Sequence, residues 1–275
     1  RERRATPAGD YRGTLDMIVD LVGGLERDAG VECSLGFGMP GSFSRVTGLV
    51  KNSNSVCLNG QPLQRDLEAL LARPLRFAND ADCFALSETV DGAGAGAGVV
   101  FGVIIGTGTG GGVVVNGRLL AGPNGIAGEW GHNSLPWPRA DELPGPDCYC
   151  GLHGCIETWL SGPGLERDHH ITTGAALEPA EISRRAAAGD AQACATLARY
   201  ADRMARALAS VINVIDPDVI VLGGGVSNIP SLYTDVPARW THYVFSDRVD
   251  TRLVPAVHGD SSGVRGAAWL WPPDA

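Results

Sequence analysis

The chain of 275 residues carries 22 Lys and Arg against 31 Asp and Glu, a formal net charge of -9 at pH 7. This acidity argues against binding to nucleic acid or anionic membranes, because both require clustered basic side chains. With 44% apolar and 19% charged residues the chain is expected to fold, and its length favours two lobes with a cleft between them. No run of about 18 apolar residues occurs and the first residues lack an apolar leader core, so we expect a cytoplasmic protein without a membrane span.

The first third of the chain predicts alternating helices and strands. Apolar side chains recur at helical spacing from Tyr11 to Arg27, with Thr14 as a candidate N-cap. Further along, the pattern predicts a strand at 34–39 that ends in Pro40-Gly41, a helix at 63–71, a strand at 75–78 and a helix at 81–88. This alternation indicates an α/β lobe.

The rest of the chain predicts a second α/β unit. Alternating Gly and Ala at 91–98 indicate a loop or hinge between two lobes. The pattern then predicts a strand at 99–105, a glycine-rich turn at 106–112, a strand at 112–115 and a hairpin turn at Asn116-Gly117. A long helix through 197–215 stops at Asp216-Pro217, a buried strand at 219–222 follows, and Ser261-Ser262 are candidate caps of a last helix through Leu270.

Three of the seven cysteines are clustered. Cys148, Cys150 and Cys155 lie within eight residues, on a loop whose glycines let the backbone turn. Three thiolates at this spacing fit a tetrahedral zinc site that lacks one ligand, and either His132 or His153 can supply it. A disulfide or a set of free thiols is the alternative. The other four cysteines are scattered among apolar residues and are expected to be buried, reduced thiols.

Asn79 and Asp80 follow a predicted buried strand. In open α/β sheets ligands bind at the carboxyl ends of the strands, where a carboxylate can accept a proton from a substrate. Asp80 is equally well explained as the N-cap of the helix that begins at Ala81.

Two glycine-rich stretches also follow predicted strands. The segment from Gly106 to Gly112 offers backbone N–H groups and two hydroxyls that a phosphate can approach closely. It is neither a Walker A loop nor a dinucleotide-binding fingerprint, and a plain hairpin turn also accounts for it. The glycines at 223–225 allow either contact with a nucleotide or close packing.

Two carboxylates and an imidazole flank the cysteine cluster, at Glu129, His132 and Glu157. Each can bind hydroxyl groups, so together they suit a polyhydroxylated ligand. Simple solvation at the surface is the competing explanation.

The combination of these motifs resembles the ROK family of sugar kinases. The family pattern Gly-Glu-x-Gly-His followed by Cys-x-Cys-Gly-x-x-Gly-Cys-x-Glu stands here at 128–132 and 148–157, and the similarity runs from about Arg3 to Trp271. The resemblance implies an α/β, two-lobed, actin-like (ribonuclease H-like) ATPase fold with an interlobe cleft. Residues 1–90 would form a small α/β lobe, joined by the C-terminal helix at about 261–272, and residues 91–260 the large lobe with the zinc loop.

The resemblance also implies a role for each motif. Asp80 would be the general base that takes the proton from the sugar hydroxyl as it attacks the γ-phosphate of ATP, which is bound with Mg²⁺. A structural zinc ion would be held by His132, Cys148, Cys150 and Cys155. The sugar pocket would be formed by Pro40, Gly41, Asn79, Asp80, Glu129, His132 and Glu157, and the nucleotide site by Gly106, Thr107, Gly108, Thr109, Gly110, Gly111, Gly112, Gly223, Gly224 and Gly225.

Three further segments are most similar to the fructokinase or manno(fructo)kinase branch of the family. They stand at 51–55, 58–62 and 258–271. The resemblance therefore implies phosphorylation of D-fructose to fructose 6-phosphate, with N-acetylglucosamine, glucose or mannose as alternative substrates. A hexose and ATP are the expected partners, nucleic acid and membranes are not, and a homodimer is left open.

One part of the family pattern is not found in the sequence. The family begins with a strand and an Asp-x-Gly-Gly-Thr-Lys-like turn that binds ATP phosphates and helps to place Mg²⁺, and nothing similar occurs before Tyr11. We therefore expect the chain as given to bind sugar and zinc but to transfer phosphate poorly. A sugar-binding protein without activity is one alternative. A sugar-responsive transcription regulator is another, although ten residues before the first helix are too few for a helix-turn-helix.

Overall fold

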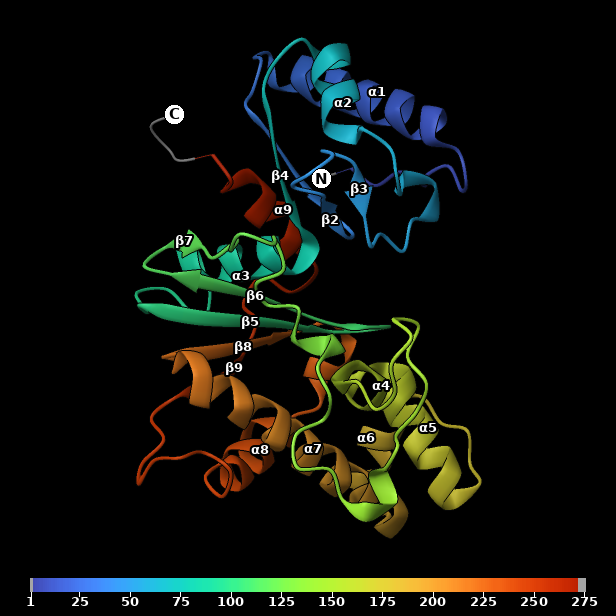
Figure 1. Cartoon of the computed structure of the whole chain (residues 1–275), viewed down its shortest axis with the longest axis vertical. Helices are drawn as coiled ribbons and strands as arrows, with labels where there is room; N and C mark the ends of the chain where they lie inside the picture. The colour runs from blue at the N-terminus through green and yellow to red at the C-terminus, as the bar shows by residue number, and fades with distance from the viewer. Residues whose placement is uncertain (1, 272–275) are drawn as a thin grey trace.

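The computed structural model describes residues 2–271, in which the helices and strands form two groups (Figure 1). The expected end of the last helix at residue 272 lies outside the described residues. The upper group in Figure 1 consists of α1 (Tyr11–Ala29), β1 (Leu35–Met39), β2 (Ser42–Phe43), β3 (Val50–Lys51), α2 (Leu63–Leu71) and β4 (Leu75–Asn79). The lower group is built on a five-stranded sheet, and α3 (Asp80–Asp91) and α9 (Ser262–Ala268) lie between the two groups.

Helix α1 is capped by Asp10. The predicted cap, Thr14, is therefore wrong. The Asp10 carboxylate accepts a hydrogen bond from the backbone N–H of Gly13 at 2.9 Å. Thr14 lies one turn into the helix, where its hydroxyl donates to the carbonyl of Asp10 at 2.7 Å. The buried face of α1 at Leu15 then packs with Leu67 of α2 in the core of the upper group.

Strands β1 and β4 run parallel, with Leu35 opposite Leu75 and Met39 opposite Asn79. Both strands therefore end at the same edge. This register brings the turn at Pro40-Gly41 next to the start of α3, where the sequence predicts functional side chains.

The five-stranded sheet has the order β7-β6-β5-β8-β9. Its strands are β5 (Val99–Ile105), β6 (Thr109–Val115), β7 (Arg118–Leu119), β8 (Val219–Gly223) and β9 (Arg252–Pro255). Strands β5, β8 and β9 are parallel, and β6 is antiparallel to β5. Alternate residues of β5 face opposite sides of the sheet. Val100 packs with Phe84 of α3 on one side, while Phe101 and Val103 join the large core on the other.

Strand β6 begins at Thr109, three residues earlier than predicted. The expected glycine-rich turn is therefore only three residues long, from Gly106 to Gly108, and the three following glycines belong to the strand. Close packing explains two of them, because a Cβ atom at Gly112 would lie 2.7 Å from the carbonyl oxygen of Ala81 in α3, and one at Gly111 would lie 2.8 Å from the ring of Phe101. The hairpin at Asn116-Gly117 forms as predicted, with both residues at positive φ.

Four helices of the lower group carry no clear signal in the sequence. They are α4 (Ile156–Leu160), α5 (Gly162–Thr173), α6 (Pro179–Ala187) and α8 (Leu232–Trp240), and they surround the predicted long helix α7 (Ala191–Ile215) below the sheet (Figure 1). The expectation of buried single cysteines holds for Cys83 only, since Cys33 and Cys194 are exposed and Cys57 is half-buried. None of the helices in residues 2–271 combines the length and apolarity that crossing a bilayer requires.

Glu88 of α3 joins the end of the chain to the middle of the molecule. Its buried carboxylate accepts hydrogen bonds from the backbone N–H groups of Ala93, Val257 and His258 at 3.0 to 3.2 Å and from the Ser262 hydroxyl at 2.8 Å. Burial alone would raise the pKa of Glu88, but these donors outweigh it and lower the pKa. The contacts hold α9 against α3, between the two groups of elements.

A buried ionic cluster fixes the segment before the cysteine loop onto α7. Glu142 accepts hydrogen bonds from Arg203 and Arg206 at 2.8 to 2.9 Å and from the backbone N–H of Arg139 at 2.9 Å. Burial alone would raise the pKa of Glu142, but these donors lower it to about 2. Arg206 is 1% exposed, so the loss of one partner would leave charges that water cannot reach.

We expect Glu142→Gln to lower the free energy of unfolding by about 3 kcal/mol, because it leaves two buried guanidinium groups short of a counter-charge. The parent chain should lose this contribution as the pH falls from about 4.5 towards 2, since the pKa of the folded carboxylate is depressed. Urea unfolding at several pH values measures both effects. The matched control is Glu181→Gln, whose exposed pairs with Arg184 and Arg185 also lower its pKa to about 2 and should contribute little. Equal effects of the two variants would contradict this prediction.

Candidate functional site

The predicted site residues lie where parallel strands end. Asn79 ends β4, Gly106 follows β5, and Gly223 ends β8. Ligands of α/β sheets bind at these carboxyl ends. Charged side chains from both groups of elements also meet there. Four of them lie close enough to Glu129 to shift its pKa, namely His132, Asp80, Glu157 and Lys51. Residues far apart in the sequence thus form one polar site.

Asn79, and not Asp80, is the N-cap of α3. The Asn79 side chain accepts a hydrogen bond from the backbone N–H of Asp82 at 2.6 Å. Asp80 lies in the first turn, with one carboxylate oxygen 2.9 Å from the backbone N–H of Ala81. Burial raises the pKa of Asp80, and the backbone hydrogen bonds only partly oppose this. The capping explanation for Asp80 is therefore wrong, and its exposed carboxyl group lies close enough to Glu129 to raise the pKa of that residue.

Glu129 and Glu157 contribute carboxylates from the lower group. Burial raises the pKa of Glu129, His132 acts against this, and the negative charges of Asp80 and Glu157 raise the pKa further. Glu157, on α4, accepts a hydrogen bond from the backbone N–H of Thr109 at 2.9 Å. The start of β6 and the first turn of α4, just after the cysteine loop, are thereby joined directly.

The glycine-rich stretches have different environments. In the turn, the N–H of Gly106 donates to the carbonyl of Gly108, and a Cβ atom at Gly106 would meet nothing within 4 Å. Gly110, Gly111 and Gly112 lie in β6 opposite residues of β5. After β8, Gly224 has φ +83°, and a Cβ atom there would lie 2.3 Å from the carbonyl oxygen of Ile105. Gly225, like Gly106, has open space around it, so these two positions leave room for a ligand to approach.

A cavity of about 240 Å³ lies beside Asn79. Gly41, at the turn after β1, lines it together with Asn79. Asp82 also lines the cavity and is not among the site residues predicted from the sequence. The only sequence signal for Asp82 is a second acidic residue in the first turn of α3, which is usually explained by the helix dipole.

His132, Cys148, Cys150 and Cys155 come together as the resemblance implies, with their potential ligand atoms all within 4.8 Å of one another. The Sγ atoms of Cys150 and Cys155 are 3.6 Å apart, and Cys148 Sγ lies 3.5 Å from His132 Nδ1. Bonds of about 2.3 Å to a tetrahedral zinc ion separate ligand atoms by about 3.7 Å. The two short separations therefore fit the edges of a tetrahedral zinc site.

His153, the other candidate fourth ligand, is directed elsewhere. Its Nδ1 atom lies 2.8 Å from the carboxylate of Asp147, and its side chain is exposed. The outer nitrogen of His132, Nε2, is 2.9 Å from the hydroxyl of Tyr149, whose ring packs edge-on against the imidazole. With Nδ1 directed at Cys148, the imidazole is held on both sides.

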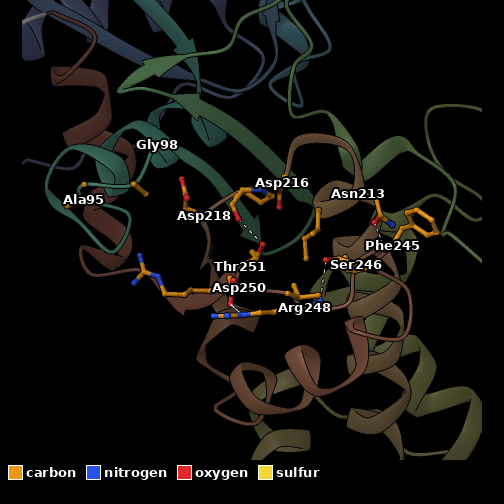
Figure 2. A pocket seen from close by; sticks show the side chains of 17 residues that line it. Ala95, Gly98, Asn213, Asp216, Asp218, Phe245, Ser246, Arg248, Asp250 and Thr251 are labelled. Carbon is orange, nitrogen blue, oxygen red and sulfur yellow. Dashed lines mark hydrogen bonds and ion pairs between the residues drawn. The ribbon is translucent and has the colours of Figure 1, made fainter.

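A second and larger cavity, of about 840 Å³, lies elsewhere in the lower group (Figure 2). The residues labelled in Figure 2 come from the turn before β5, the end of α7 and the loop before β9. Gly98, Asp218 and Thr251 directly precede β5, β8 and β9, so this cavity is at the amino ends of the parallel strands. It is therefore distinct from the site formed by Asp80 and Glu129.

The sheet order and the site between two lobes define an α/β protein with the actin-like ATPase fold. The chain belongs to the ROK family, whose pattern matches residues 1–273. It is 40% identical over 273 residues to an N-acetyl-D-glucosamine kinase of Photobacterium profundum, and the match covers 98% of this chain and 90% of the relative. Two solved structures are also similar.

The first is the ROK hexokinase of Thermus thermophilus, which is 32% identical with a TM-score of 0.85, and the match covers 99% of this chain and 91% of the hexokinase. The second is a ROK family glucokinase of Streptomyces griseus in complex with glucose and AMPPNP. It is 27% identical with a TM-score of 0.76, and the match covers 97% of this chain and 89% of the glucokinase. Sugar kinases are thus relatives of this chain over nearly its whole length.

The prediction of a fructokinase is contradicted by relatives that are N-acetyl-D-glucosamine kinases at 39% to 40% identity over nearly the whole chain. The structure supplies a reason for the error. In the segments used for that prediction, Asn59 accepts a hydrogen bond from the backbone N–H of Ser53 and donates one to its carbonyl, at 2.9 and 2.8 Å. These hydrogen bonds stabilise a loop, so the similarity of the segments is explained without any contact with the sugar.

Proposed function

We propose that this protein is an ATP-dependent kinase of N-acetyl-D-glucosamine. The observation that carries the proposal is the 40% identity, over 98% of the chain, to an N-acetyl-D-glucosamine kinase. The convergence of Asp80, Glu129 and Glu157 at the carboxyl ends of the strands supports it, because such groups bind and activate sugar hydroxyls.

In this proposal Asp80 is the general base. Its carboxyl group has a raised pKa and lies directly after β4, at the first residue of α3, where it can take a proton from the attacking hydroxyl. Asn79, Glu129, His132 and Glu157 hold the other sugar hydroxyls, and the turn at Pro40-Gly41 closes the pocket from the upper group. Because phosphoryl transfer depends mainly on position and charge, orientation of the hydroxyl is the principal task of these residues.

The nucleotide would lie against the glycine residues after β5 and β8. The open space at Gly106 and Gly225 favours this placement, since no neighbouring atom would keep a phosphate from approaching the backbone at these two positions. Mg²⁺ bound with ATP would neutralise phosphate charge. Within this interpretation residues 1–90 with the C-terminal helix form the small lobe, and residues 91–260 form the large lobe.

The four clustered ligands would hold a structural zinc ion. The 3.5 and 3.6 Å separations between ligand atoms match the edges of a tetrahedral site, and the ion would fix the imidazole of His132 in the wall of the sugar pocket. A homodimer remains a prediction from the sequence.

The test is coupled ADP release over N-acetylglucosamine, glucose, mannose and fructose, with calorimetric binding of the same sugars. We expect the highest kcat/KM and the lowest dissociation constant for N-acetylglucosamine. A preference for any of the other three hexoses would overturn the proposed substrate. If no sugar binds, the proposal of a sugar kinase fails altogether.

A further inference from the structure

The cavity beside Asn79 has walls of two kinds. Met39, Phe43 and Phe77 form an apolar part, in which the rings of Phe43 and Phe77 pack edge to face at 5.3 Å. Hydroxyl groups of Ser42 and Ser44 and the carboxyl group of Asp82 form a polar part. A group that enters this cavity should therefore combine a small apolar end with hydrogen-bonding atoms.

Asp82 has an unused hydrogen-bond acceptor. Its Oδ1 atom is shielded from solvent and has no hydrogen-bond partner among residues 2–271. The cap of α3 does not consume the side chain, because the contact there joins the backbone N–H of Asp82 to Asn79. No Lys or Arg of the described part of the chain forms an ion pair with Asp82, and the nearby Arg45 donates to the carbonyl of Gly122 at 3.2 Å.

A carboxylate oxygen that is shielded from solvent and has no hydrogen-bond partner is unfavourable for the folded protein. Burial raises the pKa of Asp82 to about 7, and the charges of Glu129 and Asp80 act in the same direction. Such a group is expected at a position where a ligand supplies the missing donor.

An acylamino group matches both walls of the cavity. It has one N–H donor, one carbonyl acceptor and a methyl end. The Asp82 carboxylate can accept from the N–H, a serine hydroxyl can donate to the carbonyl, and the two phenylalanine rings can cover the methyl group. A sugar with a plain hydroxyl in the same place has no methyl group to cover the apolar wall.

We propose that Asp82 is the residue that selects an acylamino sugar over the plain hexose, by accepting the amide N–H of the substituent in this cavity. The inference rests on the proposed kinase function and assigns the basis of its specificity. Asn79 links this cavity to the proposed general base, because its side chain caps the helix that carries both Asp80 and Asp82.

The experiment compares dissociation constants of N-acetylglucosamine and glucose, measured by calorimetry, for the parent chain and for Asp82→Ala. A hydrogen bond to a charged acceptor should make the ratio of the two constants change at least about 10-fold against N-acetylglucosamine. Asp82→Asn keeps an acceptor atom and should show a smaller change, which also provides a folded variant if the alanine variant is unstable. Asp20→Ala, which removes an exposed carboxylate of α1, is the matched control and should leave the ratio at the parent value.

The outcomes separate this inference from the function on which it rests. If the parent chain prefers glucose, mannose or fructose in the comparison of four sugars, the proposed function fails. If the parent chain prefers N-acetylglucosamine but both Asp82 variants keep its ratio, or weaken both sugars equally, Asp82 does not select the acylamino group. A changed ratio in Asp82→Ala, partly restored in Asp82→Asn, supports the inference.

Discussion

Asp80→Asn is expected to lower kcat by at least about 100-fold while the dissociation constant of the sugar changes less than about 3-fold. The amide has nearly the same shape as the carboxylate and can still accept a hydrogen bond from the Ala81 N–H, which lies 2.9 Å from Asp80 Oδ1. It cannot take a proton from the sugar hydroxyl. The loss should therefore fall on the chemical step and not on binding.

Single-turnover phosphate transfer and calorimetry on the same preparations measure these two quantities. Each rate is compared with that of the parent chain. The control is Asp91→Asn, at the far end of the same helix, where the carboxylate contacts Arg265 and His258 and not the site. Turnover near the parent rate in Asp80→Asn would remove Asp80 from the role of base.

The positions of most strands and of α2 and α7 could be predicted from the sequence, because apolar periodicity and breakers mark them clearly. Helix α2 spans Leu63–Leu71 and β5 spans Val99–Ile105, as the patterns indicate. The start of β6 was misplaced because glycine is a turn signal in a sequence. In the structure Gly112 lies against α3 and Gly111 against the ring of Phe101, and these tertiary contacts leave no room for a Cβ atom.

Site residues could be predicted from the sequence only where they belong to a motif of neighbouring residues. The cysteine cluster could be recognised from spacing, but the choice of His132 over His153 depends on a contact across 16 residues. Asp82 was missed for the same kind of reason. Its lack of a partner and its place in a cavity with Phe43 and Gly41 are properties of the folded chain, and no spacing of residues reveals them.

Loss of the proposed zinc ion should have the second large effect. Cys150→Ser is expected to weaken metal binding at least about 100-fold, because serine is a poor ligand for zinc and three donors cannot complete the tetrahedron. The variant should also unfold at a lower temperature, since the binding energy of a metal held only by the folded loop is also folding energy. Metal content after dialysis against a chelator, and thermal unfolding with and without added zinc, measure both effects.

In the proposed function the metal and the sugar pocket share the imidazole of His132, so the same substitution should raise the dissociation constant of the sugar. His132 directs Nδ1 towards Cys148 Sγ at 3.5 Å and Nε2 towards the Tyr149 hydroxyl at 2.9 Å, so the ring loses its inner attachment when the metal leaves. Cys33→Ser changes an exposed thiol remote from the cluster and should keep zinc content, unfolding temperature and sugar binding at parent values. Zinc retained at parent stoichiometry in Cys150→Ser would contradict the ligand assignment, whereas loss of zinc with unchanged sugar binding would separate the metal from the pocket.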